Sequence, residues 1–210
     1  MLDDAFKQHK KATFKIVYAC HMMGTTHQMV ALLAAFWVLT LSPVSLEPIL
    51  AVIAIFAVMI GALTPDLDHP ATNLLRRTIG GKVVHRLFSQ FSGGHRHFTH
   101  GVIGILAIYF FLQWIIYQFF QENYHPQLVI LLHAFMIGYI SHPIADTLTD
   151  QGVPWLWPIP LSIKLPPGPE ELRVTTGSFV EVVLLRGGLL IAFFFLASSH
   201  WNVLALLFRG

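Results

Sequence analysis

Five long apolar runs constrain the fold of this chain more than any other feature of its sequence. A helix needs about 20 mostly apolar residues to cross the hydrocarbon core of a bilayer, which is about 30 Å thick. Runs near that length cover residues 27–41, 49–64, 101–120, 127–148 and 187–208. We therefore predict an all-α fold, an integral membrane bundle of about five transmembrane helices. The first two runs are short, so a re-entrant or interfacial hairpin is the alternative for that pair.

The composition supports a membrane protein. Charged residues make up 11% of the chain, against roughly 25% in soluble domains, and the mean hydropathy is +0.63. The surface has too little charge for water, so most of it is expected to face lipid. A single cysteine, Cys20, excludes an internal disulfide framework. The net charge of +2 comes without a dense Lys/Arg stripe, so we expect no nucleic-acid partner.

The basic residues predict the orientation of the bundle. Of the 13 Lys and Arg residues, all but Arg209 precede the first run, lie between the second and third runs, or lie between the fourth and fifth. The loops 43–47 and 121–126, on the other side, contain neither Lys nor Arg. By the positive-inside rule the basic loops are cytoplasmic. We predict a multi-pass membrane protein with a cytoplasmic N-terminus and an external C-terminus.

Two segments stand out within the single membrane-embedded domain that we predict for residues 1–210. Residues 1–26 form a basic, amphipathic N-terminal segment. Residues 153–169 contain too many prolines for a helix or a central strand. We expect an ordered cytoplasmic loop there, with Trp155 and Trp157 anchored at the level of the headgroups. A plain connector is the alternative.

Histidine and aspartate residues gather at one set of span boundaries, where Lys and Glu would be ordinary. With the predicted orientation, all of these boundaries are cytoplasmic ends, so a bundle brings their side chains into one layer. The residues are His27 at the first span, Asp66, Asp68 and His69 at the second, His95, His97 and His100 at the third, and His142 and Asp146 at the fourth.

Imidazole and carboxylate groups of this kind are the usual ligands of Zn²⁺ and related divalent ions. His142 and Asp146 are separated by four residues, which places both on one face of a helix. This spacing alone is weak evidence, because helices often carry it by chance. Asp66 and Asp68 also have a structural interpretation, a solvated turn bounded by prolines. Thr99 is expected to be the N-cap of the third span.

Two further charged residues have both a structural and a functional interpretation. Glu181 follows Ser178 by three residues, which is the spacing of a capping box; it is also a candidate ligand or general base, because its helix begins at the same layer. Arg96 either binds a phosphate through its guanidinium fork or only follows the positive-inside rule.

Three ordered motifs carry a family resemblance. The stretches LTPDLDHP, HRHFTHG and GYISHPIADTLTDQGVPWLWP, with TTHQ upstream and TGSFVE downstream, resemble the YdjM-like family of membrane-bound metal-dependent hydrolases. The His-x-x-x-Asp element is also distantly similar to that of the zinc-dependent phospholipase C group. The resemblance implies an inner-membrane metal-dependent hydrolase. It assigns the metal site to His27, Asp66, Asp68, His69, His95, His100, His142 and Asp146.

Eight candidate ligands exceed what one four-coordinate ion uses, so we expect two ions, most simply Zn²⁺, with Mn²⁺ or Fe²⁺ as alternatives. The predicted reaction is hydrolysis of a phosphoester by a metal-activated water, with Asp66, Asp68 or Glu181 as general base. The expected substrate is a phospholipid or lipid-linked phosphate, reached from the surrounding membrane lipid. The sequence gives no oligomeric state. The alternatives are a divalent-metal transporter or sensor, and a non-catalytic scaffold held together by metal.

Overall fold

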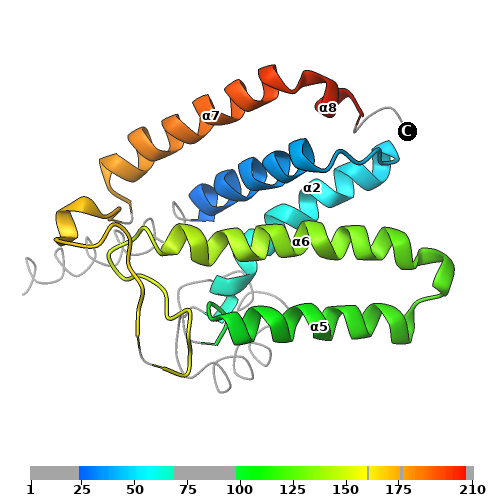
Figure 1. Ribbon diagram of the computed structural model, residues 1–210, viewed down its shortest axis with the longest axis horizontal. Helices are drawn as coiled ribbons and strands as arrows, with labels where there is room; N and C mark the ends of the chain where they lie inside the picture. The colour runs from blue at the N-terminus through cyan, green and yellow to red at the C-terminus, as the bar shows by residue number, and fades with distance from the viewer. Residues whose placement is uncertain (1–23, 69–97, 160, 176, 207–210) are drawn as a thin grey trace, which may run out of the picture.

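The computed structural model describes residues 24–68, 98–159, 161–175 and 177–206, and within these residues the fold is all-helical, without strands (Figure 1). The first element is the helix Gly24–Leu41. The elements that follow are α2 (Pro48–Leu63), the 3-10 helix η1 (Thr64–Asp68), α5 (Val102–Phe119), η2 (Glu122–Tyr124), α6 (His125–Asp146), η3 (Glu170–Leu172), the π-helix η4 (Val180–Leu185), α7 (Arg186–Ser199) and α8 (Trp201–Leu206).

Five helical segments are long and apolar enough to cross a membrane, as predicted. They are Gly24–Leu41, Pro48–Asp66, Val102–Phe119, Glu122–Asp146 and Val180–Ser199. The first two have 18 and 19 residues, so each has about the length of a full crossing. The bundle of about five membrane helices is therefore confirmed by length and composition.

The fifth span differs from its predicted bounds of 187–208. It begins at Val180 and ends at Ser199, where His200 leaves the helical conformation with φ of −126° and ψ of 39°. Glu181 was predicted to lie at the start of this helix, outside the apolar run, while Arg186 was assigned to the preceding loop. In the structure these two side chains face each other at 3.5 Å, so the helix accommodates them as an ion pair.

The two central helices, α2 and α6, cross backbone against backbone at two glycines. A Cβ atom on Gly138 would lie 2.0 Å from the carbonyl oxygen of Val58, and one on Gly61 would lie 2.1 Å from that of Phe135. Neither distance is physically accessible, so the crossing requires glycine at both positions. Small residues at helix contacts are the usual means of close approach in membrane bundles. This crossing fixes the position of α6 relative to the end of α2.

The other helices pack around this pair. The apolar contact between α5 and α6 is formed by Ile105, Ile116, Leu132, Met136 and Tyr139. On the opposite side, the helix Gly24–Leu41 packs Ala31 against Val58 and Ala62 of α2. The fifth span lies on the outside, beside Gly24–Leu41, as Figure 1 shows.

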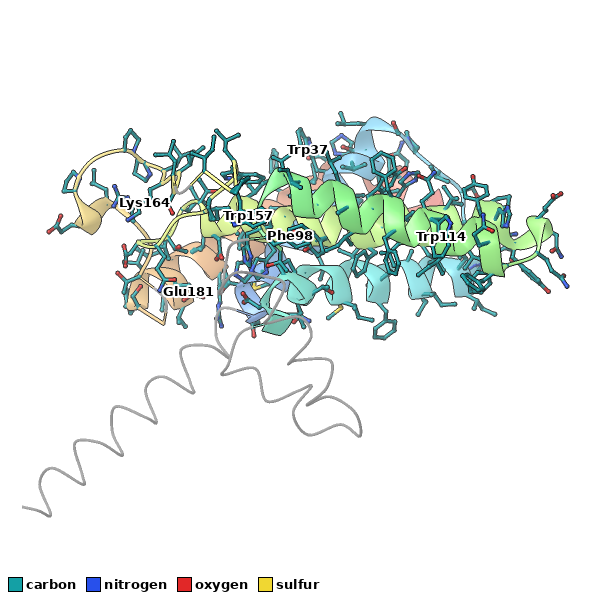
Figure 2. The ribbon with its side chains drawn as sticks, turned by 90° about the horizontal axis from the view of Figure 1, so that it is seen from below. Trp37, Phe98, Trp114, Trp157, Lys164 and Glu181 are labelled. Carbon is teal, nitrogen blue, oxygen red and sulfur yellow. The ribbon has the colours of Figure 1, made fainter. Side chains whose placement is uncertain are left out.

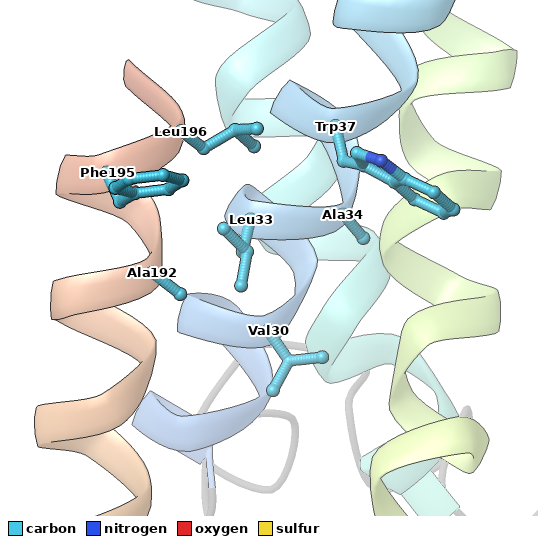
Figure 3. Close-up of a pocket in the computed structure, with 7 residues that line it drawn as sticks. All are labelled: Val30, Leu33, Ala34, Trp37, Ala192, Phe195 and Leu196. Atoms are coloured by element: carbon cyan, nitrogen blue, oxygen red, sulfur yellow. The ribbon is translucent and has the colours of Figure 1, made fainter. Parts of the chain in front are cut away.

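Large apolar side chains cover the outer surface. Phe194 and Ile191 on α7 are 76% and 72% exposed, and Phe110 on α5 is 60% exposed. Such a surface is expected where the solvent is lipid. A groove of about 380 Å³ runs between Gly24–Leu41 and α7, with Val30 and Trp37 on one wall and Ala192 and Phe195 on the other (Figure 3).

The proline-rich segment 153–169 is tied to the end of α6. The backbone N–H of Leu165 donates to the carbonyl oxygen of Thr147 at 2.8 Å, and Val153 and Ile163 exchange two backbone hydrogen bonds. Trp155 was predicted to be an anchor in the headgroup region; here its indole N–H donates to Thr147 Oγ1 at 3.0 Å. Its carbonyl oxygen accepts from the N–H of Val102 at 2.9 Å. The loop therefore holds the start of α5 beside the end of α6.

Candidate metal centre

Five of the predicted ligands lie close together at one end of the bundle, at the ends of four membrane spans. His27 lies in the first turn of Gly24–Leu41, Asp66 in η1, and His100 just before α5, while His142 and Asp146 occupy the last turns of α6. The three histidines and Asp146 are at most 1% exposed. Ionisable side chains this deeply buried in a membrane bundle generally mark a functional site.

The donor atoms of these side chains converge on one small volume. Asp146 lies among all three imidazoles: Oδ1 is 3.3 Å from Nε2 of His27, and Oδ2 is 3.6 Å from Nε2 of both His100 and His142. Asp66 Oδ1 closes the other side, at 3.4 Å from Nε2 of His142 and 3.8 Å from Nε2 of His100. Two overlapping ligand triads result, one of His27, Asp66 and His142, the other of His100, His142 and Asp146.

These separations fit the ligand shell of a divalent metal ion. Ligands held about 2.0–2.2 Å from a tetrahedral zinc ion lie about 3.3–3.6 Å from one another. The five measured distances run from 3.3 to 3.8 Å, beyond the usual N–H···O distance of about 2.7–3.2 Å. Three imidazoles and two carboxylates are also the donor chemistry that zinc and related ions prefer. The residues present therefore fit a metal ion.

Hydrogen bonds orient two of the imidazoles. Nδ1 of His142 lies 2.6 Å from the carbonyl oxygen of Ala62, so this nitrogen carries a proton and donates it. The Nε2 lone pair then faces the cluster. Nδ1 of His100 is hydrogen-bonded to Thr99 Oγ1 at 3.0 Å. Metal-binding histidines generally have their second nitrogen held in this way.

His27 is oriented differently. Its ring stacks on that of His142, with centroids 3.7 Å apart and the planes inclined by 15°. Within the part of the chain that the structure describes, its Nδ1 has no hydrogen-bond partner. The backbone of the helix Gly24–Leu41 and this stacking must therefore hold the ring in place.

Burial sets the protonation of His100, which precedes the α5 span. Burial lowers the pKa of this imidazole below its ordinary value of 6.5, and the neighbouring carboxylate of Asp146 opposes that shift. His100 is therefore neutral at pH 7, which is the form that binds a metal ion.

Thr99 was predicted to cap α5, but it does not: the N-cap is Gly101, without a side-chain cap. Instead, the hydroxyl of Thr99 binds His100.

Glu181 is fully buried, but the ligand triads do not include it. Its carboxylate accepts hydrogen bonds from the Thr26 hydroxyl at 2.5 Å and from the Gly177 N–H at 2.6 Å. Half of the predicted capping box is present, since Ser178 Oγ accepts from the Glu181 N–H at 3.3 Å. Figure 2 places Glu181 at the same end of the molecule as Phe98 and Trp157, with Trp114 at the other end.

The remaining candidates cannot be placed. His69, His95 and Arg96 lie outside the described residues, and Asp68 is described only as part of the backbone of η1.

The prediction also missed three groups that support the cluster. They are the carbonyl oxygen of Ala62, the hydroxyl of Thr26 and the guanidinium of Arg186. The position of Thr26 in the TTHQ motif was a signal, but nothing in the sequence pointed to the Ala62 carbonyl.

Comparison with known proteins gives a family for most of the chain. Residues 22–208 match the model of the YdjM inner membrane protein family. The chain is 34% identical to "Uncharacterized protein YvsG" of Bacillus subtilis (strain 168) over 129 residues, which cover 61% of this chain and 68% of that protein. It is 36% identical to "Inner membrane protein YdjM" of Escherichia coli (strain K12) over 107 residues, 50% of this chain and 48% of that protein.

The aligned part of the chain spans about half the length of the Escherichia coli protein. No solved structure matches the chain. The matches do not show the expected distant similarity to zinc-dependent phospholipase C, which stays a prediction.

Proposed function

The chain belongs to the YdjM inner membrane protein family, and from its buried cluster of imidazoles and carboxylates we propose that it is a membrane-bound metal-dependent hydrolase. One observation carries the proposal: the Nε2 atoms of His27, His100 and His142 surround the carboxylate of Asp146 at 3.3–3.6 Å. A fold stabilised by apolar packing alone has no need for such an arrangement, because burying these groups without a compensating partner costs several kcal/mol per charge.

The described donors are His27, His100, His142, Asp66 and Asp146, which suffice for one ion. A second ion would have to be held by Asp68, His69 or His95, so the ratio of metal to protein tests the prediction of two. A bound divalent ion would lower the pKa of a water molecule and neutralise charge on a phosphate oxygen. The protein supplies buried imidazoles whose Nε2 atoms face the carboxylates of Asp66 and Asp146.

Asp66 differs from the other donors in its access to solvent. Its side chain is 26% exposed, while those of His100, His142 and Asp146 are 0% exposed. The open side of the cluster therefore lies at Asp66. A substrate that reaches the cluster meets this carboxylate first, so Asp66 is our candidate for the group that accepts a proton from the attacking water.

The position of the cluster suggests the class of substrate. The donors lie at the ends of the spans that begin at Gly24 and Val102 and of the span that ends at Asp146, which is the depth of lipid headgroups. We assign these ends to the cytoplasmic face by the positive-inside rule, because the sequences of the intervening loops contain the lysines and arginines. A phospholipid or lipid-linked phosphoester presents its phosphate at that depth, and we propose such a molecule as the substrate.

The distribution of buried polar groups favours this proposal over a metal transporter. Ion pathways continue across the bilayer. Among the described residues, the buried polar side chains all lie at the metal-site end of their helices; they are Thr26, His27, Thr99, His100, Ser141, His142, Asp146, Thr147, Thr149 and Glu181. His133, nearer the middle of α6, faces outward and stacks on Tyr109.

The test combines metal content with turnover. Purified full-length protein should contain bound zinc, manganese or iron, and should release a phosphorylated headgroup from a mixture of lipid phosphoesters. His142→Ala should abolish both, and His133→Ala on the same helix is the matched control that should change neither. Stoichiometric metal without any release of product would contradict the hydrolase. Zinc flux into liposomes that His142→Ala abolishes would instead establish transport.

A non-catalytic scaffold predicts a different result for the same variants. If the metal only joins helix ends, His142→Ala should unfold the protein. Under the hydrolase proposal, turnover is lost while most of the helical content survives. Circular dichroism and thermal unfolding, with and without chelator, separate the two.

A further inference from the structure

We propose that Glu181 positions the metal ligand His27 by holding its neighbour Thr26, and is neither a ligand nor the general base. This inference rests on the proposed metal centre. It concerns the fully buried carboxylate that lies outside the ligand triads. The role follows from the hydrogen bonds of Glu181, from the orientation of His27 and from the ion pair with Arg186.

The hydrogen bonds of Glu181 leave its carboxylate little capacity for chemistry. Oε1 accepts from the Thr26 hydroxyl at 2.5 Å, and Oε2 accepts from the Gly177 N–H at 2.6 Å. The guanidinium of Arg186 lies 3.5 Å from Oε1. A general base needs an oxygen that reaches the attacking water. Both oxygens here are directed at groups of the protein itself.

The hydroxyl of Thr26 joins both charged side chains. It donates to Glu181 and accepts from Arg186 Nε at 2.9 Å. Thr26 belongs to the first turn of Gly24–Leu41, while Glu181 and Arg186 belong to the fifth span. These bonds therefore attach the two spans to each other at the end where the metal ligands lie. Only 3% of Thr26 is exposed, so water competes little for them.

His27 depends on this attachment more than the other histidines do. His142 and His100 have hydrogen bonds at Nδ1 to Ala62 and Thr99. In the described part of the chain His27 has no equivalent bond. Its ring is placed by the backbone at position 27, and that backbone is fixed by the side chain of the preceding residue. The hydrogen bonds of the neighbouring residue Thr26 thus take the place of the direct hydrogen bond that usually holds the second nitrogen of a metal-binding histidine.

The experiment titrates Co²⁺ into chelator-treated full-length protein in detergent and records the visible absorption, which reports the number and type of ligands. Supporting residues of metal sites typically change affinity by about 10–100-fold. We expect a loss of that size for Glu181→Gln and for Thr26→Val, with spectra shifted toward that of His27→Ala. Thr26→Ser keeps the hydroxyl and should retain affinity within about 3-fold. Glu171→Gln removes an exposed carboxylate of the preceding loop and is the matched control.

Two comparisons can overturn the proposal. In a His27→Ala background, Glu181→Gln should cause no further loss of Co²⁺ affinity, because it acts only through His27. An equal loss in both backgrounds would show a general effect on the fold. Unchanged Co²⁺ affinity and spectrum in Glu181→Gln would also overturn it, and lost turnover with unchanged Co²⁺ binding would make Glu181 catalytic. If wild-type protein binds no Co²⁺, the metal centre itself fails, which is a separate result.

Discussion

The imidazole Nδ1 of His142 lies 2.6 Å from the backbone carbonyl oxygen of Ala62, across the contact between α6 and α2. A carbonyl in the interior of a helix is already bonded within that helix, but Ala62 lies in the last turn, where carbonyls are left without an intrahelical partner. The end of α2 therefore supplies the acceptor that fixes the tautomer of a metal ligand on another helix.

The glycine crossing makes this hydrogen bond possible, so Gly138→Ala should disrupt the metal centre. The added methyl group meets the Val58 carbonyl at 2.0 Å and Ala62 N at 2.9 Å, which forces α2 and α6 apart. We expect a loss of at least about 1–3 kcal/mol in unfolding free energy, together with weaker metal binding. Gly188→Ala is the control, since nothing lies within 4 Å of its Cβ. Thermal unfolding in detergent compares the stability of the two variants. Equal melting temperatures would contradict the prediction.

Removal of the Asp146 carboxylate should reduce metal binding and stability more than removal of the Asp66 carboxylate. Asp146 contacts three imidazoles and is 0% exposed, while Asp66 contacts two and is 26% exposed. Breaking a buried charge cluster costs about 3–5 kcal/mol. We expect Asp146→Asn to lose metal binding and to unfold at a lower temperature. Asp66→Asn should keep the fold and lose turnover more than metal affinity. Metal titration and thermal unfolding measure these effects. A larger loss of metal affinity and stability in Asp66→Asn than in Asp146→Asn would contradict the prediction.

Removal of the metal should lower the stability of the wild-type protein. A ligand that binds only the folded state at 100 times its Kd adds about 2.7 kcal/mol to the unfolding free energy. Addition of a chelator should therefore lower the melting temperature of the wild type. It should have no effect on a His100→Ala, His142→Ala double variant, which lacks the shared histidine of both ligand triads. A chelator effect of equal size in both proteins would show that it does not act at this site.

The metal-free protein should lose stability in acid, in part through His100. Burial lowers the pKa of this imidazole in the folded protein below 6.5, so the unfolded chain takes up a proton more readily. The stability that depends on His100 is complete above pH 6.5 and decreases as the pH falls below it. Chelator-treated wild type should therefore lose more stability between pH 7.5 and 5.5 than His100→Gln. Equal losses in the two proteins would show that His100 makes no contribution.

Much of the fold and of the site was predictable, because both depend on features that recur along the chain. The apolar runs predicted five membrane helices, since hydrocarbon imposes a minimum length on each. Alternating basic loops then placed His27, His100, His142 and Asp146 at one end of the bundle. No contact between helices was needed for that step.

The remaining features depend on contacts between helices, which a single sequence does not specify. Gly61 and Gly138 are ordinary residues in an apolar run until the partner backbone is known. The apolar run of the span that begins at Val180 was predicted to begin only at residue 187, with Glu181 at the start of the helix and Arg186 counted as a loop charge. Their mutual contact at 3.5 Å and their shared partner Thr26 on another span explain why both are tolerated within the helix.

The direct contact of α2 and α6 backbones has a consequence for membranes of different thickness. Helices adapt to a thinner or thicker bilayer by tilting, and tilting is easiest where flexible side chains separate two helices. At Gly61 and Gly138 no side chain is present to deform, so the central pair should respond as one rigid unit. The outer spans, α5 and α7, would then take up the mismatch, and the ligands on α6 would keep their registration with Ala62 from one lipid composition to the next.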